Sequence, residues 1–166
     1  MKLYGLTGWK DQGKTTLMER LVTHFTEAGL SVSTIKHAHH AFDVDQQGRD
    51  SYRHRQAGAR EVLLASRKRF ALMHELRAER EWELDDLLPK LTPVDVVLIE
   101  GYKDSPHRKL ELYRTPTARG PAALTAPNIR AIAGDAAAHG LDLPQFNPDD
   151  IAAIAAFILR DAEDVT

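Results

Sequence analysis

The stretch Gly8-Trp9-Lys10-Asp11-Gln12-Gly13-Lys14-Thr15 decides the fold of this chain. It matches the pattern G-x-x-x-x-G-K-[ST] and follows the apolar residues 3–6, which are typical of a strand. A helical pattern begins directly after it, so the loop stands between a strand and a helix. In that context the backbone N–H groups of the loop and the positive end of the helix face a bound anion. The sequence therefore predicts a phosphate-binding loop; the alternative is a glycine-containing turn that only packs.

Three side chains near this loop have distinct expected roles. Lys14 would reach the β- and γ-phosphates, and the Thr15 hydroxyl would hold Mg²⁺. We expect the acidic partner of the metal to be Glu100, which follows the almost unbroken aliphatic run 94–99. Ligands of open α/β sheets gather at the carboxyl ends of strands, so Glu100 should face the phosphates and order the metal shell or a water. Its alternative role is that of a solvated carboxylate at a strand end.

The composition is that of one globular domain. The chain has 166 residues, of which 43% are hydrophobic and 28% charged, and a formal net charge of -2, so neither nucleic acid nor a membrane surface is an expected partner. The absence of cysteine excludes disulfides, cysteine nucleophiles and thiolate metal sites. The opening residues lack the features of a signal peptide, and no apolar run approaches the roughly 20 residues of a membrane span. We expect a single cytoplasmic nucleotide-binding domain over residues 1–166.

Strands and helices alternate along the rest of the chain. Apolar spacing predicts helices over residues 15–28, 51–57 and 83–91, and a last helix with Asn147 as its N-cap. Further strands are expected over residues 30–36, 61–65, 70–74, 94–99, 109–113 and 129–133. The short strand–helix–strand unit at the start implies parallel neighbours and a right-handed crossover. We therefore predict an α/β, P-loop NTPase-like three-layer sandwich with a mostly parallel sheet flanked by helices.

A polar segment after the second expected strand is rich in aspartate and histidine. Asp43 and Asp45 offer oxygen ligands that would complete the Mg²⁺ coordination, directly or through water. His37, His39 and His40 suggest a transition metal, but their spacing matches no zinc pattern and no cysteine accompanies them. We expect these histidines to hydrogen-bond within a loop near the nucleotide or to contact a partner.

The residues alone leave the base of the nucleotide open. The chain has no N-K-x-D guanine signature. Asp135 follows the last expected strand, where its carboxylate would accept hydrogen bonds from N1 and N2 of guanine, and a turn-forming role is the equal alternative. The role of the nearby basic residues is open in the same way, because Arg49 and Arg53 suit either an anionic ligand or a solvated helix face. The expected nucleotide-binding residues are Gly8, Trp9, Lys10, Asp11, Gln12, Gly13, Lys14, Thr15, Thr16 and Asp135.

Several segments together resemble the MobB family of molybdopterin-guanine dinucleotide biosynthesis adapter proteins. The phosphate loop is generic, whereas Lys36-His37-Ala38-His39-His40 and Ile99-Glu100-Gly101-Tyr102-Lys103 are far more specific. The resemblance spans nearly the whole chain in the order of the family. The other matching segments are Asp43-Val44-Asp45, Gly48-Arg49-Asp50-Ser51, Ala57-Gly58-Ala59 and Ala71-Leu72-Met73.

The resemblance implies a P-loop fold that binds GTP with Mg²⁺, hydrolyses GTP weakly and forms a homodimer. It also implies that the chain assists a molybdopterin guanylyltransferase, a MobA-type enzyme, with molybdopterin or molybdoenzyme-specific chaperones as further partners. By motif, the phosphate and metal residues are Gly13, Lys14, Thr15 and Thr16. The acidic residues implied near the site are Asp43, Asp45, Asp50 and Glu100.

The phosphate loop departs from the family at one place. The family usually carries small residues where this chain has Lys10, Asp11 and Gln12. An acidic Asp11 beside phosphates would be repulsive unless its side chain points outward or meets Lys10, so this departure bears on nucleotide affinity more than on fold.

Two other function classes stay open beside the GTP-binding adapter. A P-loop metabolite kinase would need a mobile lid, and the segment 114–127 has only Arg114 and Arg119, so it is poor in the arginine that such lids carry. A metal-insertion GTPase would use His37, His39 and His40 as transient ligands. The adapter is the leading hypothesis because of the phosphate loop and Glu100.

Overall fold

The computed structural model describes residues 1–38, 42–134 and 139–165. The chain forms two compact units, which we call the sheet unit (Met1–His37 and Leu88–Thr166) and the hairpin unit (Ala38–Leu87). That the whole chain acts as a single nucleotide-binding domain stays a prediction. None of the helices within the described ranges has the length and apolar character that a membrane crossing requires.

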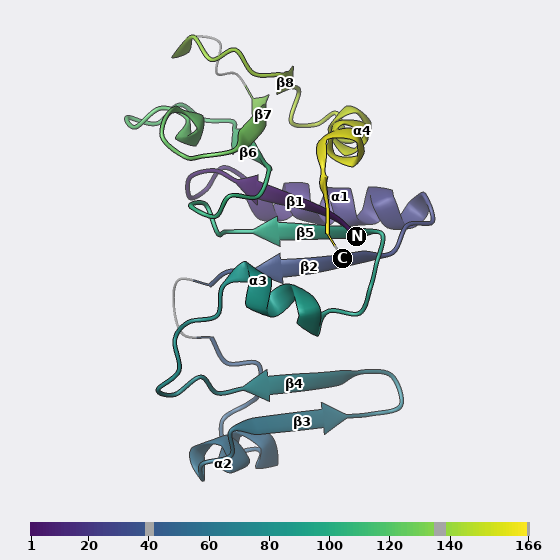
Figure 1. Cartoon of the computed structure of the whole chain (residues 1–166), viewed down its shortest axis with the longest axis vertical. Coiled ribbons are helices and arrows are strands. Elements are labelled where there is room, and N and C mark those ends of the chain that lie inside the picture. The colour runs from purple at the N-terminus through teal and green to yellow at the C-terminus, as the bar shows by residue number, and fades with distance from the viewer. Residues whose placement is uncertain (39–41, 135–138, 166) are drawn as a thin grey trace. The chain divides into compact units, whose positions relative to one another are not determined.

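The sheet unit is built on a mostly parallel sheet. In the described residues the strand order is β2-β5-β1-β6-β7-β8, and Figure 1 shows β2, β5 and β1 running side by side in the same direction. Neighbours on this path pair in parallel, and β9 pairs antiparallel with the start of β1. The strands are β1 (Lys2–Thr7), β2 (Val32–Lys36), β5 (Val96–Glu100), β6 (Lys109–Tyr113), β7 (Ile129–Gly134), β8 (Gln145–Phe146) and β9 (Glu163–Asp164).

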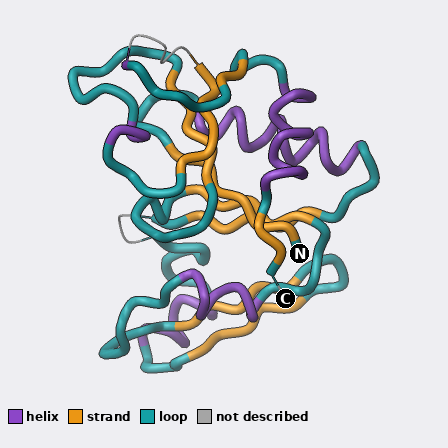
Figure 2. Tube along the Cα trace, turned by 45° about the horizontal axis from the view of Figure 1, so that its top comes forward, coloured by secondary structure: helices purple, strands orange, loops and turns teal. Residues whose placement is uncertain are grey.

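Two helices cover one face of this sheet. Helices α1 (Lys14–Glu27) and α4 (Ile151–Asp161) lie side by side in Figure 2 and share one apolar core with β1, β5 and β6. Their inward residues fall at helical spacing, as the apolar pattern predicts. Residues buried in this core include Leu17, Leu21, Phe25, Ile154 and Ile158 from the helices and Tyr4, Leu6, Leu98 and Leu110 from the strands. The predicted α/β architecture, with a mostly parallel sheet flanked by helices, is confirmed.

The opposite face of β6 carries charged side chains that are fully buried. Lys109 and Glu111 point to the same side because alternate residues of a strand share a face. The Lys109 ammonium donates to the carbonyl oxygens of Ser105 and His107 in the connection before β6. The Glu111 carboxylate accepts from the N–H groups of Ala122 (2.6 Å) and Ala123 (2.9 Å) in the connection after it. Each charge thus fixes a different loop to the central strand, as a buried charge requires.

The hairpin unit consists of an antiparallel strand pair and short helices. Strands β3 (Glu61–Ala65) and β4 (Phe70–His74) pair in the predicted places, and helix α2 (Asp50–Gln56) precedes them. Arg55 of α2 is the centre of an ion-pair cluster, with its guanidinium 2.6 Å from the Asp45 carboxylate, 2.8 Å from Asp43 and 2.7 Å from Glu75. The cluster ties the aspartate-rich segment to α2 and to the end of the hairpin.

Two predicted helices have different bounds in the structure. The helix expected over residues 83–91 is a four-residue helix α3 (Leu84–Leu87) followed by the 3-10 turn η1 (Leu88–Lys90), because Pro89 has no N–H to continue an α-helix. The N-cap of α4 is Asp150, whose carboxylate accepts from Ala153 N, and the expected cap Asn147 lies in the turn before it. Strands β8 and β9 went unpredicted, since two residues each give no alternation to detect.

Candidate nucleotide site

The phosphate loop joins β1 to α1, and its glycines adopt conformations that other residues avoid. Gly8 has a φ of +138°, and a Cβ atom there would lie 2.5 Å from the carbonyl oxygen of Leu112. Gly13 has a φ of +88° and is the N-cap of α1. The strand, loop and helix expected from the motif are therefore present, and α1 begins at Lys14 with its free N–H groups at the loop.

Gln12 fastens the loop to the end of β6. Its side chain is buried, and its amide oxygen accepts from the N–H groups of Arg114 (2.7 Å) and Thr115 (2.9 Å). Its amide nitrogen donates to the Thr115 carbonyl oxygen at 3.0 Å. Gln12 therefore holds the phosphate loop against the backbone that follows β6. Sequence reasoning missed this role because the partners of Gln12 are distant in the chain.

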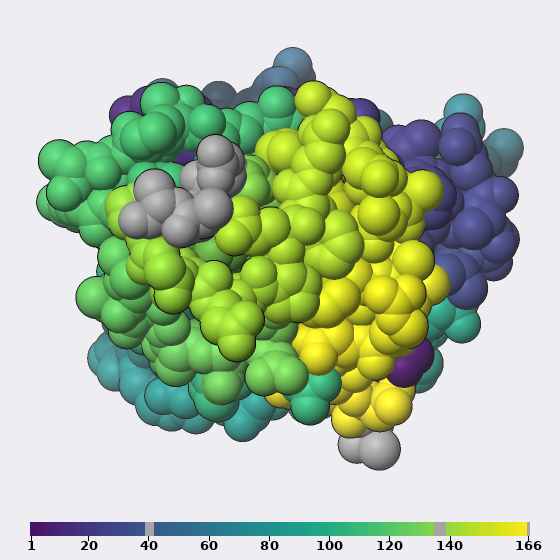
Figure 3. Space-filling view, turned by 90° about the horizontal axis from the view of Figure 1, so that it is seen from above, coloured from purple at the N-terminus to yellow at the C-terminus, as the bar shows by residue number. Residues whose placement is uncertain are grey.

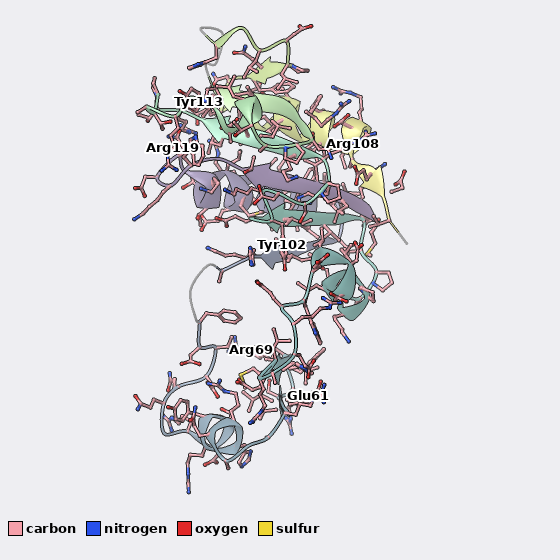
Figure 4. All side chains as sticks on the ribbon, turned by 60° about the vertical axis from the view of Figure 1, so that its left-hand side comes forward. Glu61, Arg69, Tyr102, Arg108, Tyr113 and Arg119 are labelled. Carbon is pink, nitrogen blue, oxygen red and sulfur yellow. The ribbon has the colours of Figure 1, made fainter. Side chains whose placement is uncertain are left out.

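Trp9 makes a second link between the loop and the connection after β6. Its indole N–H donates to the Gly120 carbonyl oxygen at 2.8 Å, and the Arg119 guanidinium lies over its ring at 5.3 Å. Figure 4 labels Tyr113, the last residue of β6, and Arg119 on this connection. Glu111 holds the next turn, η2 (Ala122–Leu124), by its backbone N–H groups. The connection is therefore fixed to the phosphate loop by both Gln12 and Trp9, and to the sheet by Glu111.

Lys14 and Glu100 lie close enough for their charges to interact. The Lys14 ammonium donates to the Trp9 carbonyl oxygen at 2.8 Å. Burial lowers the pKa of Lys14 below its ordinary value, and the negative charges of Glu100 and Asp11 partly offset this effect. Glu100 ends β5 as predicted, with its side chain mostly buried and a carboxylate oxygen 3.7 Å from the Lys36 ammonium. A mostly buried carboxylate therefore stands beside the phosphate loop, near the ammonium groups of Lys14 and Lys36.

The remaining loop residues are exposed. Lys10 and Asp11 both lie at the surface, and Asp11 has a φ of +63°. Thr15 and Thr16 occupy the first turn of α1 and are exposed as well. Both residues therefore lie at the positive end of the helix, where anions bind.

The predicted acidic ligands Asp43 and Asp45 belong to the hairpin unit, where both bind Arg55. The Asp45 carboxylate receives two hydrogen bonds from this guanidinium, which lowers the pKa of Asp45. Asp50 begins α2 in the same unit. That these aspartates also contribute to a Mg²⁺ site stays a prediction.

His39, His40 and Asp135 lie outside the described residues. His37 is described, and its N–H donates to the Glu100 carbonyl oxygen at 2.8 Å, so the histidine segment begins beside the end of β5. Within residues 1–38, 42–134 and 139–165, no group of three histidine, cysteine, aspartate or glutamate side chains is arranged to hold a metal ion.

A cavity of about 580 Å³, open to solvent, lies at the carboxyl ends of β7 and β8. Figure 3 shows the surface over residues 139–150 next to that of α4, which follows in the chain. Arg114 joins the cavity to the loop, since a Cβ atom on Gly13 would lie 3.8 Å from Arg114 Nε. The position of Arg114 at the end of an expected strand was a signal that could have identified it. The lining residues are Arg114, Gly134, Gln145, Phe146, Asn147, Pro148 and Asp149.

Comparison with known proteins identifies the family. A family model described as molybdopterin guanine dinucleotide synthesis protein B, MobB, matches residues 3–135. The chain belongs to the MobB family. The resemblance drawn from the lysine–histidine and glutamate–glycine–tyrosine segments is thus confirmed, and the match covers the phosphate loop, Glu100 and the hairpin unit.

MobB relatives are similar in both sequence and structure. The molybdopterin-guanine dinucleotide biosynthesis adapter protein of Escherichia coli (strain K12) is 34% identical over 161 residues, covering 95% of this chain and 91% of the relative. The protein of the same name from Haemophilus influenzae is 41% identical over 114 residues, which is 68% of this chain and 63% of the relative. The crystal structure of Bacillus subtilis MobB matches with a TM-score of 0.77 and 26% identity, covering 99% of this chain and 100% of the other.

Proposed function

We propose that this chain is a GTP-binding adapter with weak GTPase activity in molybdopterin guanine dinucleotide biosynthesis. The observation that carries the proposal is that, in this MobB chain, Glu100 at the end of β5 lies near Lys14 of the phosphate loop. The loop supplies backbone N–H groups and a lysine for phosphates, and Glu100 supplies a carboxylate to order the metal shell or the attacking water.

The residues present fit a Mg²⁺ ion. Thr15 and Glu100 offer a hydroxyl and a carboxylate, which are the hard oxygen ligands that Mg²⁺ prefers. The side chain of Glu100 is 16% exposed and has the Lys36 ammonium as its described ion-pair partner, at the long distance of 3.7 Å. When bound, the ion would neutralise phosphate charge. Thr15 would orient it, and Glu100 would order its shell or position the attacking water.

The cavity at the ends of β7 and β8 supports a purine site. Phe146 and Pro148 offer apolar surface for the ring, and the amides of Gln145 and Asn147 offer donors and acceptors for its edge. The cavity lies where open α/β sheets bind ligands, beyond the carboxyl ends of the strands. Asp135, which follows β7, stays the predicted reader of guanine N1 and N2.

The hairpin supports the homodimer. Leu63 pairs with Leu72 and Ala65 with Phe70, so one face of the hairpin is apolar, and Leu63, Leu72 and Phe70 are 60%, 52% and 74% exposed. A two-stranded sheet is marginal by itself and gains stability by covering such a face. The turn carries the positive residues 67–69, and the open end carries Glu61; Figure 4 labels Glu61 and Arg69 on the hairpin.

This distribution of charge favours a second copy of the same chain as the partner of the hairpin. A twofold axis that is perpendicular to the strands and lies in the plane of the apolar face would bring the positive turn of each copy over Glu61 of the other. The proposed partner of the resulting dimer is the MobA-type guanylyltransferase in the cytoplasm, with molybdopterin and molybdoenzyme-specific chaperones as further candidates.

The two alternative functions receive less support from the structure. Arg119 lies over the Trp9 ring, so one of the two arginines that a kinase lid would need is engaged at the phosphate loop. His37, the described member of the histidine segment, is bound at the end of β5 through its backbone. The GTP-binding adapter therefore remains the best-supported function.

Calorimetric titration with Mg²⁺-GTP and Mg²⁺-ATP tests the proposal. We expect guanine-selective binding that Lys14→Ala abolishes, because the ammonium that meets the β- and γ-phosphates is lost. The matched control is Lys2→Ala, which removes an exposed lysine paired with Asp164 at the far end of β1. Absence of GTP binding, or unchanged binding by Lys14→Ala, would refute the assignment, and a preference for ATP would favour the kinase.

A further inference from the structure

We propose that Arg114 binds the α-phosphate of the nucleotide, and that Arg20 frees it for this role by holding Asp149. The inference rests on the GTP-binding function proposed above and adds a residue outside the phosphate-loop motif. It follows from the place of Arg114 between the loop and the cavity, and from a shared ion pair at its side-chain end.

The strand order places Arg114 on one side of the phosphate loop and Glu100 on the other. Strand β1 leads into the loop and lies between β5, which ends at Glu100, and β6, which Arg114 follows. In the proposed site the terminal phosphates would bind at Lys14 and Glu100, toward the β5 side, whereas the cavity lies at the ends of β7 and β8. The part of a nucleotide that joins its terminal phosphates to its base must therefore cross the β6 side, where Arg114 stands.

The backbone of Arg114 is fixed, and its side chain reaches both regions. Its N–H donates to the Gln12 amide oxygen at 2.7 Å, which sets the distance between Arg114 and the loop. Its Nε lies 3.8 Å from the position of a Cβ atom on Gly13, and its side chain also lines the cavity. The anionic group of a nucleotide in this region is the α-phosphate, and arginine is suited to bind phosphate oxygens in pairs.

Asp149 has two arginine partners, so it can lose one of them. Arg114 lies 3.0 Å from its carboxylate, on the same oxygen that Arg20 contacts at 2.8 Å. Arg20 also donates to the Asp149 carbonyl oxygen at 3.0 Å, which makes it the better-held partner. When Arg114 turns to a phosphate, Arg20 still neutralises Asp149, so no uncompensated carboxylate is left behind.

Substitutions in the three residues distinguish this role from a structural one. Arg114→Ala should weaken the binding of GTP and GDP by the same factor, about tenfold or more, because both carry the α-phosphate. Arg114→Lys should restore part of the loss. Asp149→Asn should tighten the binding of both nucleotides, because Arg114 is no longer held away from the phosphate. Arg20→Ala should weaken it by a few fold, since among the described residues Arg114 is then the remaining ion-pair partner of the Asp149 carboxylate.

The measurement is titration calorimetry with Mg²⁺-GTP and Mg²⁺-GDP, with thermal unfolding of each variant to establish that it is folded. Arg114→Ala binding as tightly as the unsubstituted protein would overturn the inference. A loss for GTP alone would place Arg114 at the γ-phosphate and also overturn it. Equal losses in Arg114→Ala and Asp149→Asn would show that the ion pair only holds the structure. If the unsubstituted protein bound no GTP, the proposed function would fail with it.

Discussion

The rings of His37 and Tyr102 stack on each other, with centroids 4.4 Å apart and an angle of 22° between their planes. The stack joins the residues that follow β2 and β5, and the two most specific segments of the family meet in it. Gly101 makes this approach possible, because it has a φ of +100° and a Cβ atom there would lie 2.7 Å from the His37 Cβ. The contact therefore fixes the chain directly after Glu100.

Gly101→Ala should strain this turn and displace Glu100. We expect a loss of about 1–3 kcal/mol in the free energy of unfolding and slower GTP hydrolysis. Gly58→Ala is the matched control, because Gly58 has a φ of +114° with nothing within 4 Å. Denaturant unfolding and a phosphate-release assay check both variants. Equal losses of stability would mean that the approach of His37 adds nothing to the backbone strain.

Glu100→Gln should separate nucleotide binding from hydrolysis. The amide keeps the size of the side chain but loses the charge that orders the metal shell or the attacking water. We expect GTP affinity within a few fold of the unsubstituted protein and hydrolysis slower by about tenfold or more. Glu27→Gln, at the exposed end of α1, is the control carboxylate. A normal hydrolysis rate in Glu100→Gln would leave this residue with a structural role only.

Gln12→Ala should loosen the phosphate loop from β6. It leaves the N–H groups of Arg114 and Thr115 without their acceptor, which costs about 1–3 kcal/mol of stability. GTP affinity should fall as well, because the loop is no longer held in shape.

Asp11→Asn should act in the opposite direction and raise GTP affinity, since it removes an exposed negative charge near the phosphates. Unfolding curves and titration calorimetry give both quantities, and an unchanged Gln12→Ala would show that the loop keeps its shape unaided.

The free energy of unfolding should decrease as the pH is lowered, because of His107. Burial, and to a smaller degree the charge of Lys109, lowers the pKa of His107 from 6.5 to about 4. Its side chain is buried, and neither ring nitrogen has a hydrogen-bond partner in the part of the chain that the structure describes. Between pH 6.5 and about pH 4 His107 is therefore protonated in the unfolded chain but neutral in the folded protein. The stabilisation is complete above the unfolded pKa and declines as the pH falls toward 4, by roughly 3 kcal/mol.

Unfolding in urea at a series of pH values measures this decline. His107→Leu should flatten the profile in that window, because the substituted side chain has no proton to bind. His24→Leu is the control, since His24 lies on α1 and not within the buried face of β6. A profile of the His107→Leu protein that kept the same slope would assign the pH dependence to other groups.

Phe70→Ser should dissociate the proposed homodimer. The side chain is 74% exposed on the apolar face of the hairpin, so its loss removes contact area without opening a cavity in one copy. Sedimentation measurements should show a dimer for the unsubstituted protein and a shift to monomer for the variant. Leu124→Ser removes an exposed leucine of the sheet unit and should leave the dimer intact. If the unsubstituted protein sedimented as a monomer, the hairpin would need another partner.

The parts of the site that the sequence predicts are those that depend on neighbours along the chain. The phosphate loop and Glu100 could be found because a strand, a loop and a helix follow each other locally, and because strand ends gather ligands. The supports of the loop could not be found in this way. The partners of Gln12 and Glu111 are set by which strands become neighbours, and a buried Glu111 in an otherwise ordinary strand gives no sign of which N–H groups it will bind.

The hydrogen bonds of Gln12 make the phosphate loop and the connection after β6 a single unit for protein engineering. A loop with a small residue at position 12 would leave two N–H groups of this connection without the acceptor that Gln12 provides. Grafting a relative's loop into this chain should therefore succeed only when residues 113–120 are exchanged together with it. Chimeras that swap one segment at a time would lose solubility or ligand affinity for reasons that neither parent sequence displays.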